Sequence, residues 1–176
     1  MCIVSNLPPE RTTHTYFELP VDALSWEGLS GLEVANRIIA ANDIAKKDIF
    51  RAATHNKGIM NGISAVCLAI GQDVRAIEAS CHVFASYKYG AYRALTEYKL
   101  THDKTKLRGE IEIPFMMGTK GGATTSNPLY NYNMRIMGSP DTRELASIVS
   151  SVGLAQNLAA LNALVTSGIQ RGHMRL

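Results

Sequence analysis

The sequence has few cysteines, and those it has are far apart. Cys2, Cys67 and Cys81 form no CxxC pair and have no histidine cluster beside them, so neither a zinc site nor a disulfide framework is indicated. Cys67 and Cys81 lie in apolar helical contexts, where a core thiol is a better interpretation than a reactive one. This cysteine usage predicts a protein of the reducing cytoplasm, hence a cytoplasmic location.

Long hydrophobic runs and a strong net charge are also missing. No uninterrupted apolar run reaches the roughly 18–20 residues that a membrane span needs. The N-terminus has neither the basic region nor the apolar core of a signal peptide. The formal net charge is only +3, with acidic and basic residues interspersed, which disfavours nucleic-acid binding. We therefore expect neither a membrane nor a nucleic acid as a partner.

Helical periodicity dominates what is present. The composition is that of an ordinary globular protein, with 46% apolar and 19% charged residues. Pro128 suits the first position of a helix capped by Asn127 or Ser126 and ended by Gly138, and Asp73 can cap another. Apolar residues recur at steps of three and four, which predicts helices over residues 31–44, 59–70, 74–89, 140–152 and 154–168.

Strands are predicted in fewer places. Residues 96–100 and 107–113 are expected to form an antiparallel hairpin, because the second segment alternates strictly between polar and apolar residues. Near the N-terminus, residues 2–4 and 12–19 are predicted to be two short strands that pair with each other. The mixed order of strands and helices, with helices predominating, indicates an α+β fold.

Polar residues gather in the stretch from Arg51 to Asn61, directly before the apolar run that begins at Ile63. Such a cluster at the start of a buried helix is a plausible way to aim donors into a cleft. A lysine is usually a solvated surface charge, but Lys57 has His55 among its neighbours and few surface-type residues around it. An ammonium group beside a forming oxyanion in a dry site lowers the barrier to carbonyl addition. Lys57 is therefore our first candidate for chemistry.

Other candidates follow from what such a lysine needs. A carboxylate must hold it charged, and Asp73 is the nearest one after it along the chain, with helix capping as its alternative or additional role. Asn61 lies one helical turn beyond Lys57 and can share its face, although it can equally satisfy a local backbone group. His173 titrates in a range that suits a proton donor, whereas a terminal histidine is usually just solvated.

A glycine-rich loop runs from Gly118 to Thr124. It lacks the terminal Gly-Lys-Ser/Thr of a Walker A loop, and no GxGxxG follows a strand. A tight turn is therefore a better interpretation of this loop than a phosphate cradle.

Taken together, four segments resemble class II hydroxymethylglutaryl-CoA reductase, the form found mainly in bacteria. They follow one another in the order of that family, and the resemblance covers essentially the whole chain. The segments are Arg51-Ala-Ala-Thr-His-Asn-Lys-Gly-Ile-Met-Asn-Gly, Gly71-Gln-Asp73 with the following Arg-Ala-Ile-Glu-Ala, Gly121-Gly-Ala-Thr, and Val152-Gly-Leu-Ala-Gln-Asn-Leu-Ala-Ala with Gly168-Ile-Gln-Arg-Gly-His-Met.

The resemblance implies an oxidoreductase and its catalytic residues. The reaction is the reduction of a CoA thioester to mevalonate with two NADH or NADPH cofactors and no metal, or the reverse oxidation. By family analogy, Lys57 stabilises the oxyanion of the thiohemiacetal and aldehyde stages. Asp73 hydrogen-bonds that lysine and tunes it, and His173 protonates the departing CoA thiolate.

The same resemblance implies binding residues and an assembly. Arg51 and Asn61 help to bind the substrate acid or the cofactor, and Asn6 is a further residue on the cofactor side. Ala160 and Leu164, one turn apart on the last helix, form an apolar wall for the substrate. Because family members assemble as dimers with sites near the subunit boundary, a homodimer or larger homo-oligomer is expected.

Some parts of the family pattern have no counterpart. The catalytic glutamate and the Asp-x-Met-Gly-x-Asn signature are absent, and Lys120 stands where the glycine signature is usually apolar. The resemblance assigns residues 1–20 to the end of the small nicotinamide-binding domain and residues 21–176 to the large catalytic domain, without its mobile C-terminal domain. We expect such a fragment to be inactive alone. The alternative is a non-catalytic dimerisation or interaction remnant of that enzyme.

Overall fold

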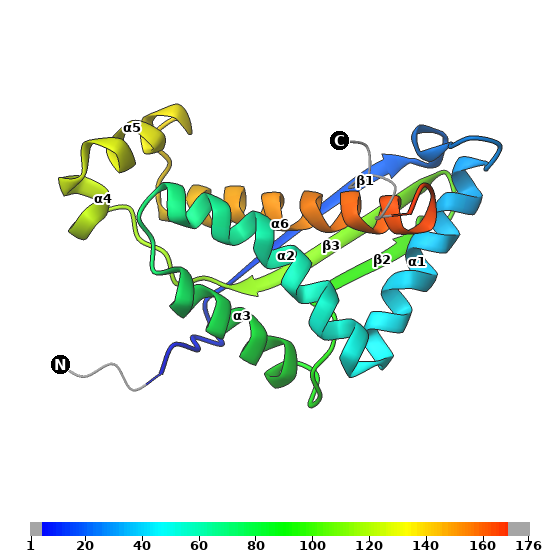
Figure 1. Ribbon diagram of the computed structural model, residues 1–176, viewed down its shortest axis with the longest axis horizontal. Coiled ribbons are helices and arrows are strands. Elements are labelled where there is room, and N and C mark those ends of the chain that lie inside the picture. Colours follow the sequence, from blue (N-terminus) through cyan, green and yellow to red (C-terminus); the bar gives the residue numbers. More distant parts are fainter. Residues whose placement is uncertain (1–4, 169–176) are drawn as a thin grey trace.

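A three-stranded antiparallel sheet forms one layer, and four long helices cover one of its faces (Figure 1). The computed structural model describes residues 5–168. The strands lie in the order β1-β3-β2. The elements of the two layers are β1 (Thr12–Pro20), β2 (Thr96–Leu100), β3 (Lys106–Pro114), α1 (Gly31–Lys47), α2 (Ile49–Ala69), α3 (Val74–Tyr87) and α6 (Thr142–Val165). This arrangement confirms the predicted α+β fold.

Three shorter elements complete the described part of the chain. A 3-10 turn, η1 (Val21–Leu24), joins β1 to the segment before α1. The helices α4 (Gly122–Ser126) and α5 (Pro128–Ile136) form a lobe that projects beyond the end of the sheet (Figure 1). Pro128 occupies the first turn of α5 and Asn127 caps it, accepting a hydrogen bond of 2.9 Å from the backbone N–H of Leu129. The prediction for this helix is confirmed.

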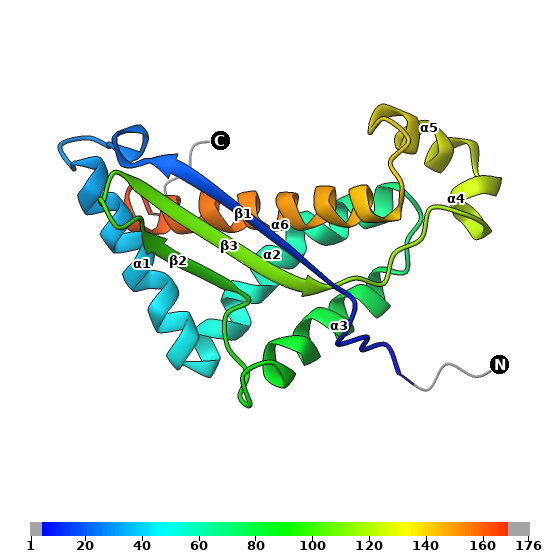
Figure 2. The same ribbon diagram turned by 180° about the vertical axis from the view of Figure 1, so that it is seen from behind.

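The two faces of the sheet differ as strict alternation predicts. Leu107, Ile111 and Ile113 of β3 are buried under the helices, whereas Arg108 and Glu110 form an ion pair of 3.0 Å on the other face. Figure 2, seen from behind, shows this second face uncovered in front of the helices. The hairpin of β2 and β3 is confirmed.

Glycine is required at position 109 in the middle of β3. A Cβ there would lie 2.5 Å from the ring of Phe17 on β1 and 2.8 Å from that of Tyr98 on β2. The two aromatic rings therefore meet over the glycine, edge to face with centroids 6.2 Å apart. This close packing joins the three strands under the helices.

The partner of the N-terminal strand differs from the prediction. β1 pairs with β3 along its full length, from Thr12 opposite Pro114 to Pro20 opposite Lys106. Residues 2–4, the predicted partner, lie outside the described residues. The pairing joins segments about ninety positions apart, and local alternation carries no information about so distant a partner.

The helix α2 begins ten residues before the apolar pattern that predicted it. Asp48 caps it by accepting a hydrogen bond of 2.9 Å from the backbone N–H of Phe50. The polar stretch from Arg51 therefore lies within the helix and not ahead of it. The apolar helical period is not visible in this stretch, because the polar residues His55 and Asn56 occupy core positions in place of apolar side chains.

The helix α6 is continuous where two helices were predicted. Gly153 does not break it but lies where α6 crosses α2, since a Cβ at Gly153 would be 2.9 Å from the Ile63 side chain. Asp141 and Glu144 form a capping box at its start. A glycine that allows close helix packing was thus mistaken for a helix end.

By length and composition α6 also meets the criteria for a membrane span. The absence of an uninterrupted apolar run in the sequence did not indicate this, because polar residues are interspersed along the helix. An 18-residue window has a mean hydropathy of 1.5, and a third of that window is buried. Core helices pass the same test, and α6 packs against α2 and β1.

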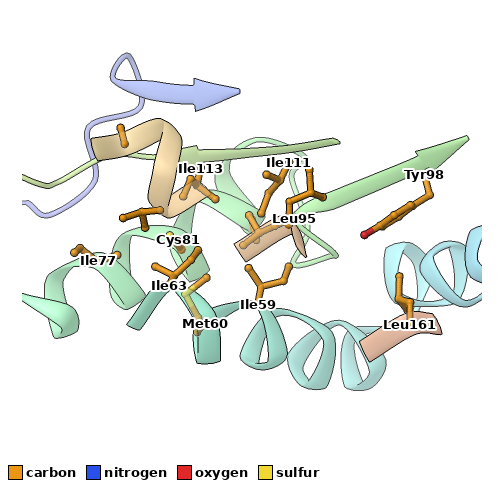
Figure 3. Packing of buried hydrophobic residues seen from close by; sticks show 14 of the residues in the cluster. Ile59, Met60, Ile63, Ile77, Cys81, Leu95, Tyr98, Ile111, Ile113 and Leu161 are labelled. Carbon is orange, nitrogen blue, oxygen red and sulfur yellow. The ribbon is translucent and has the colours of Figure 1, made fainter. Parts of the chain in front are cut away.

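The core lies between the sheet and the helices (Figure 3). Ile59 and Ile63 of α2 meet the buried side chains of β3 from one side, while Ile77 of α3 closes the cluster from another. Cys67 and Cys81 are free and buried within this core, and burial raises the pKa of each thiol to about 12. The prediction of core thiols is confirmed.

Candidate active site

Lys57 and Asn61 lie on one exposed face of α2. Four helical positions separate them, which places their side chains about 40° apart around the axis. Lys57 and Asn61 therefore share one face of α2, as predicted. Arg51 is half-buried and lies about 120° from Lys57 around the same helix, so it faces a different direction.

Asp73 does not contact Lys57 within the chain. Its carboxylate caps α3, accepting a hydrogen bond of 3.1 Å from the backbone N–H of Ala76. Between residues 5 and 168 no hydrogen bond or ion pair involves the Lys57 ammonium, and none joins it to Asp73. Capping, the alternative role weighed for Asp73, is the contact that the structure shows.

Two neighbours of Lys57 point inward and hold α2 to the rest of the molecule. Asn56 is fully buried; its side-chain NH₂ donates to the Arg93 carbonyl at 2.9 Å, and its oxygen accepts from the Leu95 N–H at 3.0 Å. These two bonds fix the segment that leads into β2. A buried amide with both ends satisfied is a strong positional constraint.

His55 joins α2 to β2 and α6 through a second buried contact. Its Nε2 lies 2.7 Å from the Thr96 hydroxyl oxygen and 3.1 Å from the side-chain nitrogen of Asn157. Burial, together with the positive charge of Arg51, lowers the pKa of His55 from 6.5 to about 4. The imidazole is therefore neutral at physiological pH.

The contact of His55 extends into a network of buried side chains from four elements. Thr96 of β2 donates to the Asn42 side-chain oxygen of α1 at 2.9 Å, and the Tyr98 hydroxyl donates to that of Asn157 at 3.0 Å. Sequence reasoning missed these residues. One sequence signal could have indicated them: amide and hydroxyl side chains recur at positions that the periodicity of the helices and strands assigns to the core.

The remaining predicted residues are placed as follows. Ala160 and Leu164 lie one turn apart on α6, the first half-buried and the second 42% exposed. Asn6 is exposed in the segment before β1. His173 lies outside the described residues.

The residues assigned to the nicotinamide do not enclose a site by themselves. Arg51 and Asn61 face directions about 80° apart around α2, and Asn6 precedes the sheet. Their side chains offer hydrogen-bond donors suited to a carboxamide or a phosphate. Over residues 5–168, no group of three or more His, Cys, Asp or Glu side chains is arranged to hold a metal ion.

Comparisons with known proteins identify the family of this chain and several of its relatives. Residues 1–176, the whole chain, match the family described as Hydroxymethylglutaryl-coenzyme A reductase, and the chain therefore belongs to that family. The 3-hydroxy-3-methylglutaryl-coenzyme A reductase of Archaeoglobus fulgidus is 47% identical over 174 residues, which are 99% of this chain and 38% of that protein.

Solved structures agree with this result. The 3-hydroxy-3-methylglutaryl-coenzyme A reductase from Streptococcus pneumoniae matches with a TM-score of 0.89 and 44% identity, over 97% of this chain and 40% of that one. A structure of the class II enzyme from the same organism, bound to NADPH in open conformations, matches with a TM-score of 0.88. The resemblance recognised from four segments is confirmed. The chain spans about two fifths of the length of these relatives.

Proposed function

We propose that this chain carries part of the catalytic site of a cytoplasmic class II hydroxymethylglutaryl-CoA reductase. The enzyme reduces the CoA thioester of hydroxymethylglutarate to mevalonate and free CoA with two NADH or NADPH, or runs in reverse. The observation that carries the proposal is the family match over residues 1–176. The NADPH-bound structure of a relative supports a nicotinamide cofactor, which supplies the hydrides when bound.

Lys57 stabilises the oxygen that becomes negative when the carbonyl is reduced. Its ammonium is held on a helix whose opposite side is fixed by the buried contacts of His55 and Asn56. Since no carboxylate within residues 5–168 pairs with it, its charge is available to an oxyanion. Asn61 adds a neutral donor on the same face. Removing one such donor from a water-excluded site costs roughly 100-fold or more in turnover.

The other roles follow the family resemblance. His173 protonates the departing thiolate, and Ala160 and Leu164 line the substrate. Asn6, Arg51 and Asn61 contact the cofactor or the substrate acid once the remainder of the site is present. These residues do not enclose a dinucleotide by themselves. The division into residues 1–20 and 21–176 belongs to the same proposal.

A homodimer accounts for the separation of Lys57 from Asp73. Phe50 and Leu68 lie within about 20° of Lys57 around α2, and they are 84% and 61% exposed. Two large apolar side chains flanking a catalytic lysine are typical of a face that another protein covers. We infer that a second copy packs on this face, excludes water from Lys57 and supplies the carboxylate that this lysine lacks within residues 5–168.

The test of the reaction replaces the matched segment of the Archaeoglobus fulgidus enzyme with residues 1–176 of this chain. We expect the chimera to oxidise NADH or NADPH in the presence of the CoA thioester, and the isolated chain to be inactive. Changing Lys57→Ala in the chimera should reduce turnover at least 100-fold. Lys47→Ala, which removes an exposed lysine at the end of α1, is the matched control. A folded chimera that keeps its rate without Lys57 would contradict the assignment.

The test of the dimer uses the isolated chain. Light scattering should give a mass of twice 19.2 kDa, and Phe50→Lys should return the chain to a monomer with an unchanged circular-dichroism spectrum. A monomer at concentrations well above micromolar would refute association through this face. A dimer whose chimera is folded but inactive would instead favour the interaction remnant, the second candidate that the exposed Phe50 and Leu68 support.

A further inference from the structure

The lobe of α4 and α5 is positively charged without local compensation. From Ile113 to Pro140 the sequence contains no aspartate or glutamate, and its only charged residues are Lys120 and Arg135. The chain as a whole has 15 acidic residues among 176, so this gap is longer than an even distribution would give.

The two cations line one cavity. It has a volume of about 390 Å³ and lies between the glycine-rich loop, α5 and the start of α6. Hydrogen-bonding groups surround it on several sides. The lining includes Lys120 and Arg135 together with Thr119, Thr125, Asn131 and Ser139.

No carboxylate in the described part of the chain forms an ion pair with these cations. Neither Lys120 nor Arg135 takes part in an ion pair within residues 5–168. Asp141 borders the cavity, but its Oδ1 already accepts from the backbone N–H groups of Arg143 at 2.8 Å and of Glu144 at 2.9 Å. These bonds orient the Asp141 carboxylate toward the start of α6, and with Lys120 and Arg135 the lining keeps a formal charge of +1.

The cavity is held in shape by its attachment to the turn between α2 and α3. Gln72 donates to the Gly118 carbonyl at 2.9 Å and accepts from the Gly118 N–H at 3.0 Å. Asn133 of α5 donates to the Ala69 carbonyl at 2.6 Å. Gly71 admits the ring of Tyr130, which would lie 2.4 Å from a Cβ there. A preformed site loses less entropy on binding than a mobile one.

We propose that this cavity binds a phosphoryl group, with Lys120 and Arg135 as its cations. A phosphate carries more than one negative charge and three or more acceptor oxygens that point in different directions. It therefore matches two cations, the hydroxyls of Thr119 and Ser139 and the Asn131 amide better than a planar, singly charged carboxylate does. The Thr125 hydroxyl already donates to the Gly122 carbonyl at 3.2 Å. The guanidinium of Arg135 can bind two of its oxygens at once, and the ammonium of Lys120 acts as a point charge.

The test titrates the isolated chain of residues 1–176 with inorganic pyrophosphate at low ionic strength. We expect saturable binding by calorimetry and shifts of backbone amide signals confined to residues 118–126 and 131–141. The double variant Lys120→Gln, Arg135→Gln should weaken binding at least tenfold, since it removes two charge-assisted contacts. Lys47→Gln, an exposed cation at the end of α1, is the matched control for net charge and should leave the affinity within twofold.

Parallel titrations with inorganic phosphate, ADP and coenzyme A identify the source of the phosphoryl group. An affinity for ADP equal to that for pyrophosphate assigns the site to the phosphates alone. A tighter ADP complex that also shifts amide signals outside these two ranges assigns it to a nucleotide, and either result supports the site. Absence of saturable pyrophosphate binding at millimolar concentration overturns the proposal, as does equal loss in Lys47→Gln and the double variant. Both outcomes are independent of the reductase reaction.

Discussion

Protonation of His55 should destabilise the fold in mildly acidic solution. Its pKa is about 4 in the folded protein, against 6.5 for the group in water, and burial is the main cause. Between these values the unfolded chain binds a proton that the folded chain does not, so the free energy of unfolding falls as pH decreases. Well above pH 6.5 the imidazole is neutral in both states and has no effect on the pH dependence.

The size of the effect follows from the two pKa values of His55. The side chain is 3% exposed, so its full shift counts. At about 1.4 kcal/mol for each pKa unit, the total loss is about 3 kcal/mol once the pH is well below 4. Between pH 7.5 and pH 5 the loss is about 2 kcal/mol, which lowers the urea midpoint by roughly 1 M for a domain of this size.

The assay is urea unfolding of the wild type and of His55→Gln at pH 7.5, 6.5, 5.5 and 5. Glutamine keeps a hydrogen-bonding group near Thr96 but cannot titrate, and the other histidines and the carboxylates are common to both proteins. The difference between the two stability curves should therefore show the loss due to His55 alone. Parallel curves, or an imidazole NMR titration of His55 centred near pH 6.5, would refute the reasoning.

Three other predictions concern packing, capping and thiol chemistry. Gly153→Val should lower the free energy of unfolding by about 1–3 kcal/mol, because it overpacks the α2–α6 crossing. Gly58→Ala should raise it by about 0.5–1 kcal/mol, because a Cβ at Gly58 would meet open space. Thermal melting measures both changes. Asp73→Ala should cost about 1 kcal/mol through loss of the α3 cap, and Asp73→Asn should cost little because asparagine also caps. Cys67 and Cys81 should resist a thiol reagent at pH 8 until urea unfolds the chain, as peptide mass spectrometry would show; labelling of the folded protein would contradict their burial.

The elements with local signals were predictable from the sequence. The period of the apolar residues gave α1 and α3, strict alternation gave β3, and the combination of Asn127 with Pro128 gave the start of α5. Each of these signals acts between residues within one or two turns of each other. The physical interaction and its sequence pattern therefore lie in the same window.

The features that depend on distant partners were not predictable. Gly153 has the same local context whether it ends a helix or lets another helix approach, and only Ile63 decides between them. His55 looked like one more polar residue beside Lys57, because its partner Asn157 is 102 positions away. The position of Lys57 on the same face as Asn61 followed from helix geometry, but the separation of Lys57 from Asp73 required the structure.

The long-range pairing of this molecule has a consequence for how it folds. β1 is the first described strand, and its partner β3 comes about ninety positions later. Arg37 of α1 donates to the carbonyl of Val165, the last residue of α6. Closing such large loops must precede most of the stabilising contacts, so folding should be slow for a helix-rich chain. During synthesis, Ile59 and Ile63 have no complete cover until α6 has been made. The chain is therefore most exposed to aggregation just before α6 is added.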